Sequence, residues 1–337
     1  MRRFHRSTPR DASRNRLWVF IAVGLFLLVD VYLVSTALTS SRADNSLPAA
    51  TTVATLAATP TPSPTASAAA AVVVSPVPAT RILAAVSATV AWRAVSGICP
   101  DPLAAPEVST DAGATWTSTD ANRPTEVTAL QSISASNGSV AEFVGFAQSD
   151  CSAQVVRTFV GGDNYSSLKD AADTAWYVDP ANRAEVHGPN GLQPAPCDAV
   201  VALAPGSGDE AAVLCADANV FATTDAAATW SAPLAVPGAL TLTVTPDGYL
   251  ALAAGAADAQ PIAGADTDTS CLGLSVIDLS AATDTGDLTA TTTGCYDTAE
   301  APATLAGNVA VAVADDTLWL WIGDATVRST DAGQTWL

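Results

Sequence analysis

The sequence predicts an all-β domain built from repeated short strands, and three observations lead to that prediction. Valine and threonine dominate long stretches, which are broken by Gly and Asp residues of the kind found in tight turns. An eight-residue motif that ends in tryptophan occurs three times between residue 109 and the C-terminus. Short apolar runs separated by Gly and Asp turns precede the motif, as expected of antiparallel strands. Long helices are therefore expected only near the N-terminus.

The first 38 residues have the composition of a basic cytoplasmic segment followed by a transmembrane helix. Residues 1–16 contain six arginines and a single acid, Asp11. Residues 17–38 are apolar except for Asp30 and a few small polar residues, and this length is enough to cross a hydrocarbon core of about 30 Å. The positive-inside bias places the N-terminus in the cytoplasm and the rest of the chain outside. We therefore predict a single-pass protein of the cell membrane.

Two features of this segment leave alternatives open. The sequence SRA at residues 41–43 loosely matches a cleavage site, so a cleaved signal peptide is the alternative to an uncleaved signal anchor. The apolar stretch is longer than the roughly 7–15 residues of a signal-peptide core, which favours the anchor. Asp30 either pairs with a polar group on a partner helix or is tolerated alone, at a cost of about 2.5–3.5 kcal/mol.

Residues 39–70 are predicted to form a disordered linker. This tract consists mainly of Ala, Thr, Ser and Pro, includes the run TPTPSPTAS, and contains no aromatic residue. It has too little apolar area to form a core, and its prolines favour an extended polyproline II backbone. Residues 71–337 then form the extracytoplasmic domain.

The most specific signal is the repeated octapeptide at residues 109–116, 223–230 and 329–336. The copies read STDAGATW, TTDAAATW and STDAGQTW, and the second has alanine at the glycine position. They resemble the Asp-box, or bacterial neuraminidase repeat, whose pattern is S/T-x-D-x-G-x-T-W. In that family the box joins the third and fourth strands of a β-propeller blade, away from the ligand face. The resemblance assigns structural roles to Asp111, Gly113, Trp116, Asp225, Trp230, Asp331, Gly333 and Trp336.

We expect these residues to stabilise a turn rather than to catalyse a reaction. The Asp carboxylate accepts hydrogen bonds from backbone N–H groups, and the Gly occupies a position with positive φ. The Trp packs between strands and buries a large apolar area. Strands are expected before each box, and the run LWLWI at residues 318–322 is apolar on both faces, as in a strand buried between blades.

The spacing of the boxes predicts about five blades, with six or seven as the alternative. Successive boxes lie more than 100 residues apart, whereas one blade takes about 40–50 residues, so each gap should contain another blade. A degenerate copy at residues 156–165 has Val160 in place of Asp and Tyr165 in place of Trp. The sequence stops one residue after Trp336, so we expect the last blade to borrow residues 72–77 as its fourth strand.

Six cysteines lie in the predicted extracytoplasmic domain, and an even number in an exported domain indicates three disulfides. Two pairs are symmetric about predicted hairpin turns, one centred on Gly206 and the other on Thr283. The two remaining cysteines pair by elimination. The predicted disulfides are Cys197–Cys215, Cys271–Cys295 and Cys99–Cys151.

The charge of the chain excludes one class of partner. From Arg81 onward the sequence contains thirty Asp and Glu residues against six Arg and Lys169. Nucleic-acid binding requires a basic surface that displaces counterions. Such a strong acidic excess therefore argues against binding to nucleic acid. We interpret the charge as a source of solubility outside the cell.

Asp-box propellers include sialidases and other glycoside hydrolases, so the resemblance raises the question of catalysis. Sialidases of this kind hold the substrate carboxylate with three arginines and use a Tyr–Glu pair and an Asp acid/base. Here the tripeptide RIL at Arg81 is a fragment of their first arginine motif, and Arg93, Arg123 and Arg183 lie in no recognisable motif. No Tyr–Glu pair is identifiable, so we predict no catalytic residue, no cofactor and no metal site.

The least repetitive stretch, residues 175–191, is a candidate binding loop. It contains Trp176, Tyr177, Arg183 and His187 among Pro and Gly turns, and such side chains on an inserted loop can form a binding surface. The alternative is a fourth strand followed by a long turn, with Trp176 in the core.

Together these features predict a membrane-anchored extracytoplasmic propeller that binds or scaffolds an unknown protein or glycan. The photosystem II assembly-factor propellers are similar in repeat type, and they imply a scaffold. The alternative is a sialidase-like glycoside hydrolase. Convergence of Arg93, Arg123 and Arg183 with a Tyr–Glu pair at the central channel would favour the hydrolase.

Overall fold

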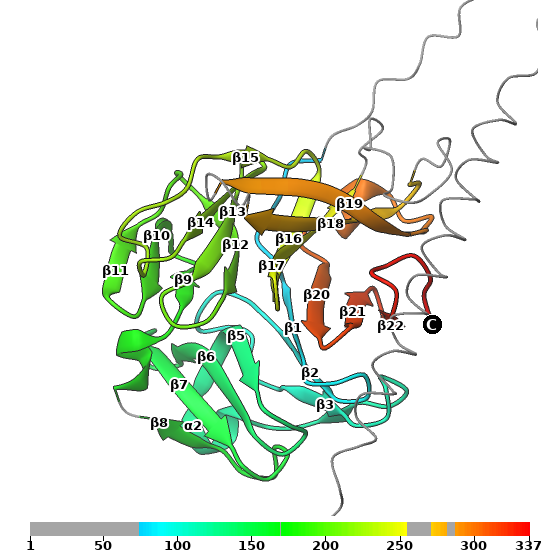
Figure 1. Ribbon diagram of the computed structural model, residues 1–337. Coiled ribbons are helices and arrows are strands. Elements are labelled where there is room, and N and C mark those ends of the chain that lie inside the picture. The colour runs from blue at the N-terminus through cyan, green and yellow to red at the C-terminus, as the bar shows by residue number, and fades with distance from the viewer. Residues whose placement is uncertain (1–73, 169, 255–270, 282–286) are drawn as a thin grey trace, which may run out of the picture. The chain divides into compact units, whose positions relative to one another are not determined.

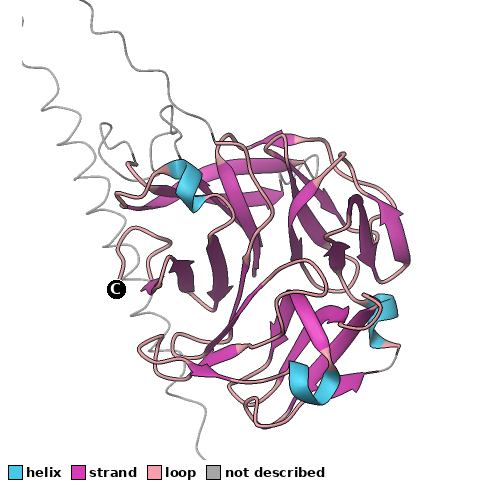
Figure 2. Cartoon of the chain, turned by 180° about the vertical axis from the view of Figure 1, so that it is seen from behind, coloured by secondary structure: helices cyan, strands magenta, loops and turns pink. Residues whose placement is uncertain are grey.

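The computed structural model describes residues 74–168, 170–254, 271–281 and 287–337 (Figure 1). The predicted transmembrane helix at residues 17–38 and the linker at 39–70 lie outside these ranges. Within them, no helix is both long enough and apolar enough to span a membrane. The described chain is almost entirely strands and loops, and its short helices are α2 (Asn122–Thr125), η1 (Ala171–Thr174) and α3 (Pro302–Leu305) (Figure 2).

Six antiparallel sheets form a ring, and we number them as blades in chain order (Figure 1). The strands of blade 1 are β1 (Arg81–Ala85), β2 (Ala91–Val95), β3 (Glu107–Ser109) and β4 (Thr117–Ser118). Those of blade 2 are β5 (Val127–Ala135), β6 (Ala141–Ala147), β7 (Ala153–Thr158) and β8 (Ser166–Leu168). Those of blade 3 are β9 (Tyr177–Asp179), β10 (Asn182–Gly188) and β11 (Gly191–Pro194).

The second half of the ring repeats this arrangement. The strands of blade 4 are β12 (Val200–Pro205), β13 (Ala211–Cys215), β14 (Asn219–Thr223) and β15 (Leu234–Ala235). Those of blade 5 are β16 (Ala239–Thr245), β17 (Gly248–Ala254), β18 (Leu274–Ala281) and β19 (Leu288–Tyr296). Those of blade 6 are β20 (Val309–Ala314), β21 (Thr317–Ile322) and β22 (Ala325–Ser329).

The innermost strands of neighbouring blades contact one another around the whole ring. Strand β1 contacts β5, β5 contacts β9, β9 contacts β12, β12 contacts β16, β16 contacts β20, and β20 contacts β1 again. The chain is therefore a six-bladed β-propeller. The expectation of five blades is wrong, and the stated alternative of six is confirmed.

Blade 3 explains the error in the blade count. Its three strands follow one another within residues 177–194, two of them (β9 and β11) are short, and no octapeptide marks them. Residues 175–191 therefore build most of a separate sheet. They are neither an inserted loop nor a single fourth strand followed by a turn, which were the two interpretations of the sequence. The second interpretation is right in one respect, because Trp176 is buried in the core cluster that joins blades 3 and 4.

The apolar core lies between blades rather than at the centre of the ring. One buried cluster joins blades 1 and 2 through Trp92 and Phe143, whose rings meet edge to face at 5.7 Å. Other clusters join blades 3 and 4, blades 4 and 5, and blades 5 and 6. Every residue of β21 is buried, as expected of a middle strand whose sheet is covered on both faces.

The three octapeptide turns share one set of hydrogen bonds. In the last copy the Asp331 carboxylate accepts bonds from the Ser329 hydroxyl, the Thr335 N–H and the Thr335 hydroxyl, at 2.7, 2.8 and 2.6 Å. The same three bonds form around Asp111 and Asp225. The bond from the Thr335 hydroxyl contributes most to lowering the pKa of Asp331 to about 2.

The glycine position of the octapeptide has positive φ in every copy. The angle is 82° at Gly113 and 87° at Gly333, and Ala227 adopts 66° at the same position of the second copy. The degenerate turn keeps this backbone as well, with Gly162 at 91° and its N–H bonded to the Thr158 hydroxyl at 3.0 Å. The fold of the turn is thus retained where its Asp is absent.

The octapeptide tryptophans are half-buried and pack against the preceding blade. The Trp336 indole N–H donates to the Cys295 carbonyl in blade 5 at 2.8 Å. The Trp230 N–H donates to the Pro194 carbonyl in blade 3 at 3.3 Å, and Trp116 lies edge to face with Trp319 of blade 6. These side chains therefore join blades to one another.

All three predicted disulfides are present. Cys99–Cys151 links the β2–β3 connection of blade 1 to the β6–β7 connection of blade 2. Cys197–Cys215 ties the segment before β12 to the end of β13, and Cys271–Cys295 ties the segment before β18 to β19. No cysteine is free.

The ring does not close by the strand exchange that the sequence suggested. Residues 74–77 form no strand, and the neighbouring Thr80 N–H donates to the Gly307 carbonyl just before β20. The outer edge of β22 instead pairs with Leu337, whose N–H donates to the Arg328 carbonyl at 2.8 Å and whose carbonyl accepts from the Arg328 N–H. The prediction that residues 72–77 complete blade 6 is wrong for the described part of that segment, because Leu337 already occupies the edge.

Candidate functional site

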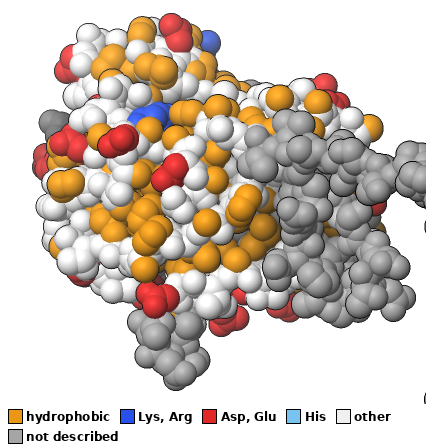
Figure 3. Space-filling model, turned by 90° about the horizontal axis from the view of Figure 1, so that it is seen from above, with side chains coloured by type: hydrophobic (Ala, Val, Ile, Leu, Met, Phe, Trp, Pro, Cys, Tyr) orange, Lys and Arg blue, Asp and Glu red, His pale blue; other side chains and the backbone are white. Residues whose placement is uncertain are grey.

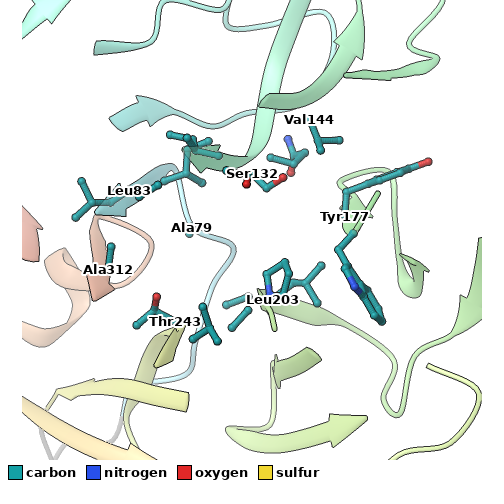
Figure 4. A pocket seen from close by; sticks show the side chains of 18 of the residues that line it. Ala79, Leu83, Ser132, Val144, Tyr177, Leu203, Thr243 and Ala312 are labelled. Atoms are coloured by element: carbon teal, nitrogen blue, oxygen red, sulfur yellow. The ribbon is translucent and has the colours of Figure 1, made fainter. Parts of the chain in front are cut away.

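The innermost strands of all six blades surround a central cavity of about 650 Å³. Figure 4 shows this space with side chains from every blade around it, among them Leu83, Ser132, Tyr177, Leu203 and Thr243. Most of the lining residues are small or aliphatic, and hydroxyls of Ser and Thr supply much of the polar surface. The cavity is the channel of the propeller, and this position suits a site that receives a ligand from one face.

Among the described residues, three charged side chains line the channel: Arg81, Glu142 and Arg183. Glu142 forms an ion pair with Arg157 of the adjacent strand β7. Arg81 donates to the Gly323 carbonyl and lies over the Trp321 ring. The two lining arginines also have acidic neighbours, Asp324 beside Arg81 and Asp179 beside Arg183, so the charges along the channel wall are largely balanced.

The described channel lining contains a single acid, Glu142, which contrasts with the outside of the molecule. The chain as a whole has a formal net charge of −19. On the side of the molecule seen in Figure 3, acidic side chains are scattered over the surface and basic ones are few. The channel is therefore a chemically distinct part of the propeller.

Blade 3 contributes the aromatic part of the channel wall. Trp176, Tyr177 and Arg183, which were expected on one binding loop, all line the cavity. The Trp176 N–H donates to the Gly208 carbonyl in the β12–β13 hairpin at 3.1 Å, whereas Arg183 donates to the Val200 carbonyl at the start of β12 at 3.0 Å. Since these acceptors flank the two ends of β12, Trp176 and Arg183 lie at different depths of the channel.

His187 completes the set by packing against Tyr177. The two rings are stacked with centroids 4.6 Å apart, and the His187 Nδ1 lies 3.0 Å from the Ala175 carbonyl. Phe146 of blade 2 meets Tyr177 edge to face. Burial raises the pKa of Tyr177 and lowers that of Arg183, although the carboxylate of Asp179 opposes the second effect. The Tyr177 ring is therefore held between His187 and Phe146, and in Figure 4 its hydroxyl points away from the middle of the cavity.

The arginines named as sialidase candidates do not converge. Arg93 is a partner of Glu107 within blade 1, and Arg123 is exposed on α2 beside Asp120. Only Arg183 of the three lines the channel. Glu142 is the single carboxylate among the lining residues that the structure describes, so the channel wall lacks the pair of acids that glycoside hydrolysis uses.

Sequence reasoning missed a cluster at the junction of blades 1 and 6, which we call the seam. It consists of Arg81, Arg93, Trp116, Trp319, Trp321 and Arg328. The Arg328 guanidinium donates to the Ala88 carbonyl at 2.7 Å, and the Trp319 N–H donates to the Ser87 carbonyl at 3.0 Å. The alternating tryptophans of the LWLWI run indicated a buried aromatic cluster, but nothing in the sequence indicates which residues contact them.

The described residues also contain one group that resembles a set of metal ligands. Cys271, Cys295 and Asp297 lie close together, but the two cysteines are joined in a disulfide. The Asp297 carboxylate lies 3.4 Å from the Cys295 sulfur. Because a disulfide removes both thiolates, this group is read as a crosslink.

No family model matches the sequence, and no curated protein sequence does so either. Among solved structures, the chain is similar to YCF48 bound to D1 peptide, with 15% identity, coverage of 77% of this chain and 82% of that chain, and a TM-score of 0.35. It is similar to YCF48 from Cyanidioschyzon merolae at 13% identity, 78% and 86% coverage, and a TM-score of 0.25. It is also similar to the GH74 xyloglucanase from Xanthomonas campestris at 13% identity, 76% and 41% coverage, and a TM-score of 0.22. Likenesses this low carry no information about function, and the propeller assignment rests on the six sheets themselves.

Proposed function

We propose that the chain is a membrane-anchored, extracytoplasmic propeller of the Asp-box type that binds a protein or glycan partner at its channel. The Asp-box part of the proposal is supported by the three octapeptide turns, in which Asp111, Asp225 and Asp331 accept the same hydrogen bonds. The turns adjoin the hairpins between the first two strands of their blades, since Ala112 N–H donates to the Thr89 carbonyl and Ala226 N–H to the Asp209 carbonyl. The opposite face is left for a partner.

The observation that carries the binding function is the channel. It is lined by all six blades, has a volume suited to a small ligand or a few residues of an extended segment, and combines Tyr177 and Arg183 with hydroxyl groups. Hydrolysis of a glycoside uses two carboxyl groups at a defined separation, and the described lining offers only Glu142, already paired with Arg157. A binding module accounts for this wall better than a hydrolase does.

The location outside the membrane is supported by the cysteines and the N-terminal sequence. Three disulfides persist in an oxidising compartment and are rare in the cytosol. Residues 17–38 have the length and composition of a membrane span, and the six arginines before them favour an inside N-terminus. Deletion of residues 1–38 behind a cleavable signal sequence should release the protein from the membrane fraction, and retention there would contradict the proposed anchor.

Site-specific photo-crosslinking in intact cells tests the binding function. A photoreactive residue in place of Ser132, on the channel wall, should give a discrete adduct. The same residue in place of Thr330, exposed in the last octapeptide turn, is the matched control and should give none. Mass spectrometry of the adduct decides between a protein and a glycan. Identical adducts from both positions would show that the channel is not the binding site.

The hydrolase alternative has its own test. Purified protein should leave a panel of aryl glycosides and sialosides uncleaved. Turnover that is abolished by Glu142→Gln and retained in Asp316→Asn, an acid in the β20–β21 turn, would replace the binding proposal with catalysis.

A further inference from the structure

A short loop beside the channel exposes two large aliphatic side chains. It connects β2 to β3, and we call residues 96–103 the rim loop. Ile98 is 63% exposed and Leu103 is 51% exposed, and Val95, the last residue of β2, is also exposed. Single exposed apolar side chains are ordinary, but several within nine residues of one segment mark a surface that is suited to contact with another molecule.

The rim loop lies at the edge of the channel, on the face opposite the octapeptide turns. Its first residue, Ser96, lines the cavity together with Gln131. The Gln131 side-chain amide donates to the Gly97 carbonyl at 3.0 Å. The loop follows β2, so it lies at the end of blade 1 opposite the β1–β2 hairpin, which contacts the first octapeptide turn.

The loop is held in place despite its exposure. The Cys99–Cys151 disulfide fastens it to blade 2, and Leu103 forms a β-bridge with Thr128. The Ala129 N–H donates to the Pro102 carbonyl at 2.8 Å. The segment is therefore already ordered before a partner binds. Association has a smaller entropic cost than it would have with a flexible loop.

Glycine at position 97 allows the loop to fold back on itself. A Cβ atom at this position would lie 2.2 Å from the Pro102 Cδ and 2.6 Å from the Asp101 carbonyl oxygen. The compact shape that presents Ile98 and Leu103 to solvent thus depends on a residue without a side chain.

The chemistry of the exposed side chains selects a protein over a glycan. Ile98 and Leu103 have no hydrogen-bonding group and no aromatic face, which are the features that bind sugars. Aliphatic side chains of this size pack against apolar side chains in the cores of protein interfaces. The channel alone is compatible with either a protein or a glycan partner, and the exposed side chains of the rim loop favour a protein.

The charges around the loop indicate the composition of the partner. Asp101 within the loop, Asp150 beside the disulfide and Glu126 are exposed carboxylates. The nearby Arg123 is already paired with Asp120. A partner segment with basic residues next to its apolar ones would complement this surface, whereas an acidic segment or an anionic lipid surface would be repelled.

We infer that the rim loop docks a protein segment in which large apolar side chains are flanked by Lys or Arg. This inference rests on the proposed binding function and specifies its partner. It assigns Ile98 and Leu103 to the contact and the surrounding carboxylates to the choice of segment.

Selection from a random peptide display library, with purified full-length protein as bait, tests the inference. The selected peptides should be rich in apolar and basic residues, and Ile98→Asp should weaken their binding at least tenfold in fluorescence anisotropy. Leu192→Asp is the matched control, because Leu192 is 56% exposed on β11 of another blade, and it should change binding less than twofold. Ile98→Ser, which adds no charge, should weaken binding in the same direction.

Three results would overturn the inference. They are an acidic or apolar-free consensus, equal binding by wild type and Ile98→Asp, and Ile98-dependent binding of the protein to a glycan array or to vesicles of phosphatidylcholine and phosphatidylglycerol. Because both substituted side chains are exposed, unchanged thermal unfolding confirms that each variant is folded. If the peptides crosslink to position 132 and bind the Ile98→Asp variant as tightly as the wild type, the channel is the binding site and the rim loop has no role in it. Absence of any crosslink at position 132 would instead contradict the proposed binding function of the channel.

Discussion

The guanidinium carbon of Arg93 lies 4.1 Å from the centroid of the Trp116 ring, and this contact is part of the seam between the first and last blades. The same guanidinium lies 4.6 Å from the ring of Trp321 in blade 6 and donates to the Thr326 hydroxyl there. It also forms an ion pair with Glu107. A single side chain thus joins the two blades through aromatic contacts, a hydrogen bond and neutralisation of a carboxylate.

Arg93→Met should lower the free energy of unfolding by about 2–4 kcal/mol, because it leaves Glu107 unpaired and removes contacts with two indole rings. The Arg93 side chain is only 13% exposed, so water screens these interactions weakly. Urea unfolding followed by tryptophan fluorescence measures the loss. Arg123→Met is the control, since its pair with Asp120 is exposed and should contribute about 0.5 kcal/mol or less. Equal losses in the two variants would mean that the seam has no special role.

Asp331 should make stability fall in acid. Its hydrogen bonds with Thr335 and Ser329 hold its pKa at about 2, below the usual value of an aspartate. Since the folded state binds the proton more weakly than the unfolded state, this contribution is complete above about pH 4 and is lost as the pH falls toward 2. Asp331→Asn should therefore lower the thermal unfolding midpoint at pH 6. The midpoint of this variant should also fall less between pH 5 and pH 2 than that of the wild type. Asp316→Asn, in the β20–β21 turn, should keep the wild-type slope.

Gly333→Ala should destabilise the protein by about 1–3 kcal/mol, because the position combines a φ of 87° with a tight contact. An added Cβ would lie 2.6 Å from the Val276 Cγ2 in blade 5. Gly323→Ala isolates the backbone effect, because Gly323 also has positive φ but a Cβ there meets nothing within 4 Å. The difference between the two variants in chemical unfolding measures the packing of the last octapeptide turn against blade 5. No difference would show that blade 5 yields to the added methyl group.

Val160→Asp should stabilise the degenerate turn by up to about 1 kcal/mol, since an Asp there would accept a hydrogen bond from the Thr158 hydroxyl. The turn already has the backbone of the intact copies, and Val160 is exposed. Val160→Ser removes the exposed apolar side chain without supplying a carboxylate. If the Ser variant is equally stabilised in thermal unfolding, the gain comes from lost apolar exposure and not from the restored motif.

Much of the fold could be predicted because its signals are local. The LWLWI run at residues 318–322 was predicted as a buried strand and lies within β21 (Thr317–Ile322), since turn residues flank it on both sides. Two disulfides, Cys197–Cys215 and Cys271–Cys295, followed from hairpin symmetry for the same reason, and Cys99–Cys151 followed by elimination. Blade 3 was not recognised because its two edge strands, β9 and β11, are short and the blade carries no octapeptide.

Contacts between distant parts of the sequence were beyond prediction. Pairing of Leu337 with Arg328 depends on where the chain turns after Trp336, and strand exchange with residues 72–77 was an equally consistent reading of the sequence. The channel wall is assembled from small residues of six strands, none of which has a recognisable pattern. Arg93 was considered as a ligand-binding residue because nothing in the sequence reveals that Trp321 lies beside it.

Closure of the ring through the seam has a consequence for the order of folding. The bond from Trp319 to the Ser87 carbonyl joins residues 232 positions apart, and the bond from Arg328 to Ala88 joins residues 240 apart. Contacts of such high contact order form slowly, because a long loop must close before they give any stabilisation. During synthesis blade 1 is complete long before blade 6 exists, so the Trp116 face of blade 1 stays uncovered while the intervening blades assemble. This interval, rather than the finished ring, is when the chain is most exposed to aggregation and to capture by chaperones.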